Sequence, residues 1–165
     1  MVKNSRQITI KALGKKHKAS LIGFDVYSDI AVLKTSLREL NPIKFPDKYE
    51  INVGDIVYAV GNPFDLGVSV SKGILSATGR NFGNPYLDVI QTDASINQGN
   101  SGGALLNSQG QFLGLSTLIA SSSGGSDGVG FALPAEKVIQ ISQDLIKYGE
   151  VQRAWIGNFL SLIHI

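Results

Sequence analysis

Apolar and polar residues alternate over short stretches through most of the chain, as they do in β-strands that bury one face. QITIKAL at 7–13 shows this alternation, and two further apolar stretches follow at 19–24 and 30–33. Later stretches of the same kind are separated by glycine, asparagine and proline, and they lie at 55–60, 68–79, 86–91, 103–107, 111–118 and 128–133. Short strands at this spacing predict an all-β chain that contains an antiparallel barrel.

One stretch near the C-terminus has the period of an amphipathic helix instead. Its apolar residues at helical spacing are Val138, Ile141, Leu145 and Tyr148. Pro134 suits the first helical position, and Gly149 suits a C-terminal stop. The pattern therefore predicts one helix over 134–149.

Charged and turn-forming residues mark the connections between these elements. GKKHK at 14–18 predicts a solvated basic hairpin tip, and residues 25–29 predict a second turn. Residues 35–54 contain Pro42 and Pro46 and few apolar pairs, so we interpret them as a connector between two halves of the molecule.

The amino-acid composition excludes some classes of function for this chain. The chain has 165 residues, of which 43% are hydrophobic and 17% charged, as in a soluble globular protein. The net charge of +2 is too small to predict binding to nucleic acid. There are no cysteines and only two remote histidines, so we expect no disulfide, no metal and no cofactor. The N-terminal residues lack the continuous apolar run of a signal peptide or membrane span, so no targeting segment is expected in this chain.

The sequence GNSGG (99–103) places Ser101 in a setting suited to nucleophilic chemistry. A serine hydroxyl is a weak nucleophile, so it needs a neighbouring base and donors for the oxyanion that forms. Gly99 allows the backbone to turn so that the N–H groups of Gly99 and Ser101 point into one space, which predicts an oxyanion hole. A glycine-rich β-turn between two strands is the alternative interpretation.

The sequence motifs around this serine resemble those of the HtrA family of trypsin-like serine proteases. They are TDASINQGNSGGAL at 92–105, GNPFDLG at 61–67, GILSATGR at 73–80 and GVGFALP at 128–134. SATGR, TDASIN and RAWIG (153–157) place the chain nearest the DegS type, although DegP and DegQ types share most of these words. The resemblance implies a trypsin-like double antiparallel β-barrel whose N-terminal barrel is incomplete.

The resemblance also implies the division of the chain. A partial N-terminal barrel is expected at 1–40, a connector at 41–54 and a C-terminal β-barrel with the nucleophile loop at 55–133. The C-terminal helix then occupies 134–149. Residues 150–165 would be the start of a linker to a PDZ domain, which this chain lacks, followed by an irregular tail.

By the same resemblance Asp29, in YSDIAVLK, matches the aspartate of the catalytic triad, with Ser101 as the nucleophile. A carboxylate at the start of the apolar stretch 30–33 is expected to be rigid and partly buried. The alternative is a turn or cap aspartate, which is the interpretation we favour for Asp25.

Neither histidine of the chain is expected to act as the base. His17 lies among the lysines of the predicted hairpin tip, and His164 lies next to the C-terminal residue. The histidine of the family would align upstream of Met1. We therefore expect this chain to be truncated and inactive on its own.

The resemblance assigns further residues to specificity and regulation. Ser95, six positions before Ser101, stands where trypsin-type enzymes that cleave after lysine or arginine carry an acid, so a basic side chain would be buried there without a partner. A shallow pocket for small aliphatic side chains is expected instead, with an edge for β-pairing of an extended substrate. Its residues are Ser95, Ile96, Ser116, Thr117 and Leu118. Arg80 and Gln91 match a DegS-type activation network, with a surface arginine and a strand-end glutamine as the alternative.

The function implied by resemblance is that of a serine endopeptidase in bacterial envelope quality control or stress signalling. Its partners would be misfolded envelope polypeptides or, for a DegS-type member, an anti-sigma factor. The family implies a homotrimer in the periplasm, associated with the inner membrane if DegS-like. A non-catalytic peptide-binding relic and a gene fragment are the alternatives.

Overall fold

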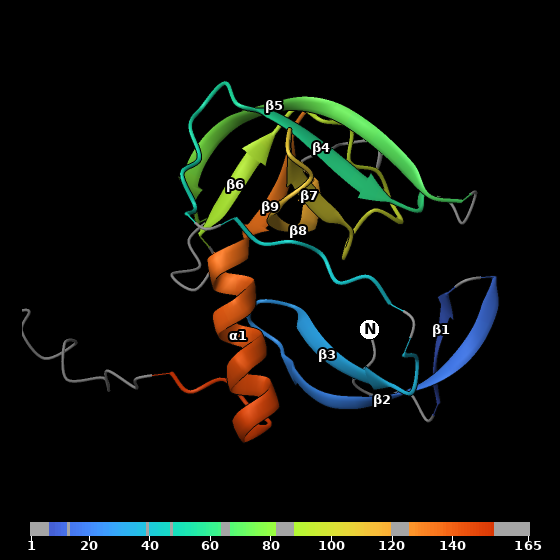
Figure 1. The fold of residues 1–165 in the computed structure, drawn as a ribbon. Coiled ribbons are helices and arrows are strands. Elements are labelled where there is room, and N and C mark those ends of the chain that lie inside the picture. Colours follow the sequence, from blue (N-terminus) through green and yellow to red (C-terminus); the bar gives the residue numbers. More distant parts are fainter. Residues whose placement is uncertain are drawn as a thin grey trace, which may run out of the picture.

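The computed structural model describes residues 7–12, 14–38, 40–46, 48–63, 67–81, 88–119 and 126–153. These residues form strands and one helix in the order drawn in Figure 1. The elements are β1 (Ile8–Ala12), β2 (Lys15–Asp25), β3 (Ile30–Thr35), β4 (Ile56–Gly61), β5 (Ser69–Arg80), β6 (Val89–Thr92), β7 (Ala104–Asn107), β8 (Phe112–Ile119), β9 (Gly130–Pro134) and α1 (Ala135–Tyr148).

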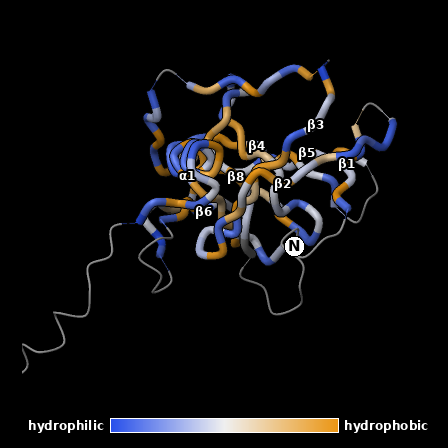
Figure 2. The backbone as a smooth tube through the Cα atoms, turned by 90° about the horizontal axis from the view of Figure 1, so that it is seen from below, coloured by the Kyte–Doolittle hydropathy of each residue, from blue (hydrophilic) through white to orange (hydrophobic). Residues whose placement is uncertain are grey.

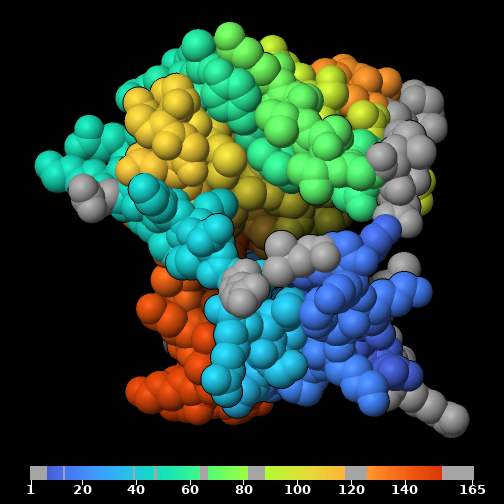
Figure 3. Space-filling model, turned by 45° about the vertical axis from the view of Figure 1, so that its right-hand side comes forward, coloured from blue at the N-terminus to red at the C-terminus, as the bar shows by residue number. Residues whose placement is uncertain are grey.

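The strands make two separate antiparallel systems. β1, β2 and β3 form a three-stranded sheet in that order, and the other strands close a barrel in the order β4-β5-β6-β9-β8-β7. Figure 3 shows the barrel (green to yellow) and the sheet (blue to cyan) as two lobes, with the residues after β3 running between them. The predicted all-β class, with one closed barrel and one partial barrel, is confirmed.

The barrel closes because alternate residues of its strands are apolar and face a common interior. On β4, Val57 and Ala59 point inward, while Ile56 lies exposed on the outer face. The interior is filled by one cluster of buried side chains, which consists of Val57, Ala59, Leu75, Ile90, Ala94, Ile96, Leu105, Leu113 and Ala132.

The helix α1 joins the barrel to the three-stranded sheet. Ile141 and Leu145 of α1 pack with Ile30 of β3 and with the barrel residues Val89, Phe131 and Leu133 in a second buried cluster. Figure 2 shows hydrophilic residues on the side of α1 that faces away from the strands. Among the described residues, no helix combines the length and apolarity needed to cross a bilayer.

Two details of the helix differ from the sequence pattern. Pro134 is the N-cap rather than the first helical residue, whereas Gly149 is the left-handed C-cap, as the pattern indicates, and its N–H donates to the Leu145 carbonyl at 3.0 Å. Tyr148 is 52% exposed rather than part of the buried face. Its ring lies at the surface next to the Lys147 ammonium, because the buried face ends at Leu145.

The predicted basic hairpin tip is wrong in its extent. Residues 15–18 belong to β2, where Lys16 pairs opposite Lys11 and His17 opposite Ile10. The turn itself lies at Gly14, whose φ of 73° is one that glycine adopts readily. Pairing with β1 therefore extends the strand through the lysines, because backbone hydrogen bonds form whatever the side chains are.

Candidate active site

Ser101 lies in the loop that leads from β6 into β7, on the exposed surface of the barrel. Two tight turns shape this loop. The Asn100 N–H donates to the Asn97 carbonyl at 3.0 Å, and the Gly103 N–H donates to the Asn100 carbonyl at 2.8 Å. The Gly102 N–H donates to the Ser116 carbonyl of β8 at 2.7 Å, so the loop is fixed to the barrel directly after the serine.

The backbone N–H groups of Gly99 and Ser101 differ from those of neighbouring residues in their hydrogen bonding. Within the part of the chain that the structure describes, neither N–H has a protein acceptor, whereas those of Asn100, Gly102 and Gly103 are bonded. Backbone N–H groups in folded proteins are nearly always paired with protein or water. These two are therefore available to an oxygen that enters from solvent beside Ser101.

Glycine is required at several positions around this serine. Gly99 and Gly102 have φ values of 99° and 83°, which side chains with a Cβ rarely adopt. A Cβ on Gly103 would overlap the Val60 carbonyl oxygen, and a Cβ on Gly61 would overlap the Asn100 side chain. The GNP and GNSGG motifs are therefore in contact in the fold, because the buried Asn100 side chain packs against Gly61.

The Ser101 hydroxyl is held by the backbone in this structure. Ser101 Oγ donates to the Thr117 carbonyl oxygen at 3.3 Å. His17, the histidine among the described residues, lies in β2 with its Nε2 buried and without a hydrogen-bond partner. His164 lies outside the described residues. The structure therefore places no described imidazole in a hydrogen bond with Ser101 Oγ.

Asp29 ends the turn between β2 and β3. Its φ of 56° is the only positive value among the described residues other than glycine, and Ile30 directly after it is buried. The expected partial burial of Asp29 is wrong, because its side chain is exposed. The buried carboxylate of this turn is Asp25, which is 6% exposed.

Asp25 is tied to a residue far along the chain. Arg153 Nη1 donates to Asp25 Oδ1 at 2.7 Å, and Arg153 Nη2 donates to Oδ2 at 2.6 Å. The backbone N–H and the hydroxyl of Ser28 also donate to Oδ2, at 2.9 and 2.5 Å. Burial alone would raise the pKa of this carboxyl, but these hydrogen bonds and the arginine charge outweigh burial and hold the pKa at about 2.

The sequence pattern gave no sign of this ion pair. Asp25 and Arg153 are 128 residues apart. An arginine just after a helix C-cap has no feature that identifies its partner. The burial of Asp25, which only the structure shows, is what indicates a cationic partner, since buried charges are almost always paired.

The predicted pocket residues lie on both sides of the nucleophile loop. Ser95 is exposed, and its carbonyl accepts a hydrogen bond from Ser71 Oγ at 2.8 Å. Ile96 is 1% exposed and belongs to the barrel core, where it contacts Gly130 closely. The pocket assignment of these residues stays a prediction.

The predicted β-pairing edge on β8 is partly closed. The Ser116 N–H donates to the Gly103 carbonyl at 2.9 Å, and the Ser116 carbonyl accepts from Gly102. Ser116 and Leu118 also pair opposite Ala132 and Phe131 of β9. An extended substrate cannot pair at Ser116 in this arrangement, because the Ser116 N–H and the Ser116 carbonyl are both bonded to the loop, at Gly103 and Gly102.

Arg80 and Gln91 lie on neighbouring strands at one end of the barrel. Arg80 ends β5 and is exposed, and Gln91 on β6 is half-buried opposite Ala77. A cavity of about 340 Å³ lies near this end, between the N-terminus of α1 and the strand β5. The structure describes Tyr49 among its lining residues. Burial raises the pKa of the Tyr49 hydroxyl, and the Glu136 charge raises it further.

Comparison with known proteins places this site in a family. Residues 2–115 match the family model for the trypsin-like peptidase domain. The periplasmic serine endoprotease DegP of Escherichia coli is 44% identical over 147 residues, which is 87% of this chain and 31% of that protein. A probable DegP-like periplasmic endoprotease of Brucella suis is 48% identical over 147 residues, again 87% of this chain and 29% of that protein.

Solved structures agree with the sequence relatives. The HtrA-type protease AlgW with a decapeptide superposes with a TM-score of 0.90 at 43% identity, over 94% of this chain and 49% of that one. The serine endoprotease from Yersinia pestis superposes with a TM-score of 0.83 at 40% identity, over 94% and 54% of the two chains. The chain spans about a third of the length of its curated relatives. It belongs to the trypsin-like peptidase domain family and, within that family, to the HtrA-type serine proteases.

Proposed function

We propose that this chain supplies the nucleophile, the oxyanion hole and the triad carboxylate of a serine endopeptidase. Ser101 is the nucleophile, the N–H groups of Gly99 and Ser101 form the oxyanion hole, and Asp29 orients the base. The observation that carries the proposal is the pair of N–H groups on either side of Asn100, which have no acceptor among the described residues and lie next to an exposed serine.

The chemistry that this arrangement supports is acyl transfer. Ser101 Oγ attacks the carbonyl carbon of a peptide bond while its proton passes to a base. The carbonyl oxygen becomes an oxyanion, which the two N–H groups stabilise by charge-assisted hydrogen bonds. The amine then leaves with the proton, and water hydrolyses the acyl-serine ester by the same route.

The base in this proposal is a histidine outside the described residues. Ser101 Oγ donates to the Thr117 carbonyl, which accepts a hydrogen bond but cannot remove a proton at neutral pH. An imidazole has to replace this acceptor before Ser101 becomes nucleophilic. We refer to the chain lengthened at its N-terminus by a segment that brings such a histidine to Ser101 as the extended chain.

The substrate class proposed is extended polypeptide. One relative, AlgW, was solved with a decapeptide. Ser95 supplies no carboxylate at the position where lysine- and arginine-specific enzymes carry one, so small aliphatic side chains are favoured over lysine and arginine at the cleaved position. Thr117 and Leu118 remain the positions for pairing with the substrate backbone, since the Ser116 N–H and carbonyl are already bonded to the loop.

The relatives support a setting for this activity. Several are named as periplasmic proteases, so we propose the periplasm for the whole protein. Cleavage of misfolded envelope proteins, or of an anti-sigma factor by a DegS-type member, is the proposed role there. A homotrimer, association with the inner membrane, and regulation through Arg80 and Gln91 are part of the same proposal.

A second candidate function is peptide binding without catalysis. It is favoured by one observation, which is that the Ser101 hydroxyl is bonded to a carbonyl rather than to a base. In that case the N–H pair would bind a peptide carbonyl or carboxylate and no ester would form.

The deciding experiment compares the extended chain with its Ser101→Ala variant on a peptide library that varies the cleaved position. We expect cleavage after small aliphatic residues, and a loss of roughly 10⁶-fold in kcat for the variant, as for other triads that lose their nucleophile. Binding of the same peptides should persist in the variant. Cleavage by the Ser101→Ala variant at the full rate would refute the catalytic assignment, and binding without any cleavage by the extended chain would favour the second candidate.

A further inference from the structure

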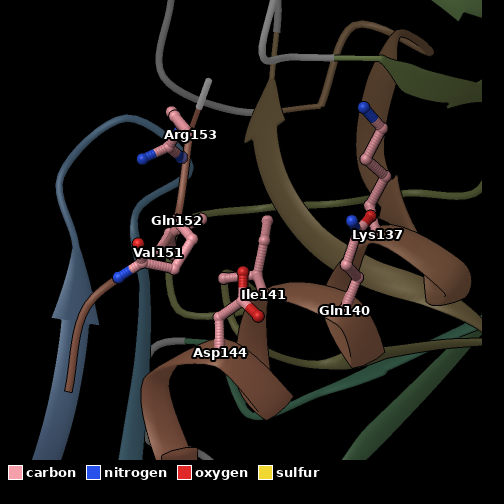
Figure 4. A pocket seen from close by; sticks show the side chains of 7 residues that line it. All are labelled: Lys137, Gln140, Ile141, Asp144, Val151, Gln152 and Arg153. Carbon is pink, nitrogen blue, oxygen red and sulfur yellow. The ribbon is translucent and has the colours of Figure 1, made fainter. Parts of the chain in front are cut away.

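Residues 150–153, which follow α1, return along the helix toward the turn that carries Asp29 (Figure 1). Val151, Gln152 and Arg153 line a cavity of about 130 Å³ together with residues of α1. Figure 4 shows the Arg153 side chain directed away from α1, toward the turn between β2 and β3. The segment after the helix is thus anchored on the connecting turn of the three-stranded sheet through Arg153, and Val151 also packs on the cluster that includes Ile141 and Leu145 of α1.

Arg153 makes a bidentate contact in a largely buried setting. Its two terminal nitrogens bond the two oxygens of Asp25, and the side chains of Arg153 and Asp25 are 20% and 5% exposed. The guanidinium also lies over the Tyr27 ring, 4.9 Å from its centroid. Fork-to-carboxylate geometry with an aromatic face is specific to arginine, because a lysine has no planar pair of donors.

The same carboxylate fixes the rest of the turn. Ser28 donates its N–H and its hydroxyl to Asp25 Oδ2, and Ser28 is buried. Asp29 follows directly with a φ of 56°, a left-handed conformation that is unfavourable for a residue with a Cβ. Such a conformation persists only where the surrounding contacts determine it, and here those contacts are Asp25, Ser28 and the buried Ile30.

We propose that Arg153 is a positioning residue for Asp29, which acts through Asp25 and Ser28 to hold the turn in the conformation that presents the Asp29 carboxylate. The proposal rests on the proposed function, in which Asp29 orients the base. It follows that the position of the segment after α1 is coupled to the active site. A movement that withdraws Arg153 releases the turn and lowers the rate of the chemical step.

The kinetic test is a double-mutant cycle in the extended chain. Arg153→Gln should lower kcat roughly ten- to a hundredfold with little change in KM, since a small misplacement of a catalytic group has effects of this size. Arg153→Lys should recover part of the rate, because it restores the charge without the fork. In an Asp29→Ala background, Arg153→Gln should lower kcat less than about twofold further, since the group that it positions is already absent.

The matched control is Lys137→Gln, which removes a positive charge from the same cavity without touching the turn. It should keep the parent kcat. Equal losses for Arg153→Gln in the parent and in the Asp29→Ala background would mean a general structural effect, and would overturn the proposal. Unchanged kcat in a folded Arg153→Gln protein would also overturn it. If Arg153→Gln does not fold, Asp25→Asn or Arg153→Lys replaces it, and each is again measured in the parent and in the Asp29→Ala background.

A second measurement does not depend on catalysis. In the 165-residue chain, the backbone amide NMR signals of Ser28, Asp29 and Ile30 should shift or broaden in Arg153→Gln and not in Lys137→Gln. Unchanged signals in Arg153→Gln would overturn the positioning role. Shifted amide signals in Arg153→Gln, found together with full activity of Ser101→Ala, would refute the proposed function. They would still support the effect of Arg153 on the turn.

Discussion

At the scale of single residues, the geometry of the candidate site depends on positions that have no side chain. Gly103 and Gly61 are close to the Val60 carbonyl and to the Asn100 side chain. Gly110 also has a positive φ, of 74°, but a Cβ there would meet nothing within 4 Å. Substitution of Gly103 tests the cost of a steric clash, and substitution of Gly110 tests the cost of a left-handed backbone conformation.

We expect Gly103→Ala to lower the free energy of unfolding by about 3 kcal/mol, because the new Cβ would displace backbone. Gly110→Ala should lower it by about 1 kcal/mol, the cost of the backbone angle alone. Urea denaturation of both variants measures the difference. Equal costs would show that the close approach at Gly103 is not maintained in solution.

The Asp25 carboxyl predicts a dependence of stability on pH. Its pKa is about 2 in the folded chain against 3.8 in the unfolded chain, so the folded state favours the ionised form. A lowered pKa contributes stability above the unfolded value, and that stability is lost as pH falls from about 4 toward 2. The contribution is about 2 kcal/mol. Urea denaturation between about pH 2 and 6 should show this loss in the parent and a much smaller one in Asp25→Asn.

At the scale of elements, α1 is the part that joins the two lobes. Leu145 is fully buried between β3 and the barrel, whereas the next residue, Ile146, is 64% exposed. The C-cap at Gly149 also lies near Gly23 of β2, where a Cβ would be 2.9 Å from the Gly149 carbonyl oxygen. The helix therefore stabilises the contact between lobes through one face and one end.

Leu145→Ala should lower the free energy of unfolding by about 2–5 kcal/mol, since it leaves a cavity in the second cluster. The neighbouring change Ile146→Ala should cost less than about 0.5 kcal/mol, because that side chain is in solvent. Thermal or urea unfolding of the two variants compares them directly. Similar costs at both positions would contradict the packing of α1 on the two lobes.

At the scale of the whole molecule, the proposed oxyanion hole and nucleophile lie on the barrel, and Asp29 lies in the turn between β2 and β3 of the three-stranded sheet. The helix α1 packs on both lobes. Arg153, which follows α1, bonds Asp25 at the turn before β3. A site assembled across two lobes is sensitive to their relative position. In the proposed mechanism, the base is a histidine outside the described residues.

The 165-residue chain should therefore react slowly with a fluorophosphonate probe, which labels activated serines. The extended chain should be labelled rapidly at Ser101. The reason is that the Thr117 carbonyl holds the hydroxyl without removing its proton. Rapid labelling of the 165-residue chain that is lost on changing His17 would show that His17 is the base.

The sequence by itself determined the features that depend on local pattern. Alternation of apolar residues predicted the barrel strands, because only one face of each strand is buried, as Val57 and Ala59 show against Ile56. Helical spacing predicted α1 and its end at Gly149. The glycines around Ser101 predicted a loop with special backbone angles, and Gly99 and Gly102 have them.

Tertiary structure alone decided what depends on partners distant in sequence. Pairing with β1 placed residues 15–18 in a strand, although their charges suggest a turn. Asp25 is buried in a bidentate contact with Arg153, 128 residues away, whereas Asp29 in the same turn is exposed. The Ser101 hydroxyl points to the Thr117 carbonyl because barrel closure brings β8 beside the loop. Burial and hydrogen bonding are set by the nearest atoms in space, and a linear pattern does not contain that information.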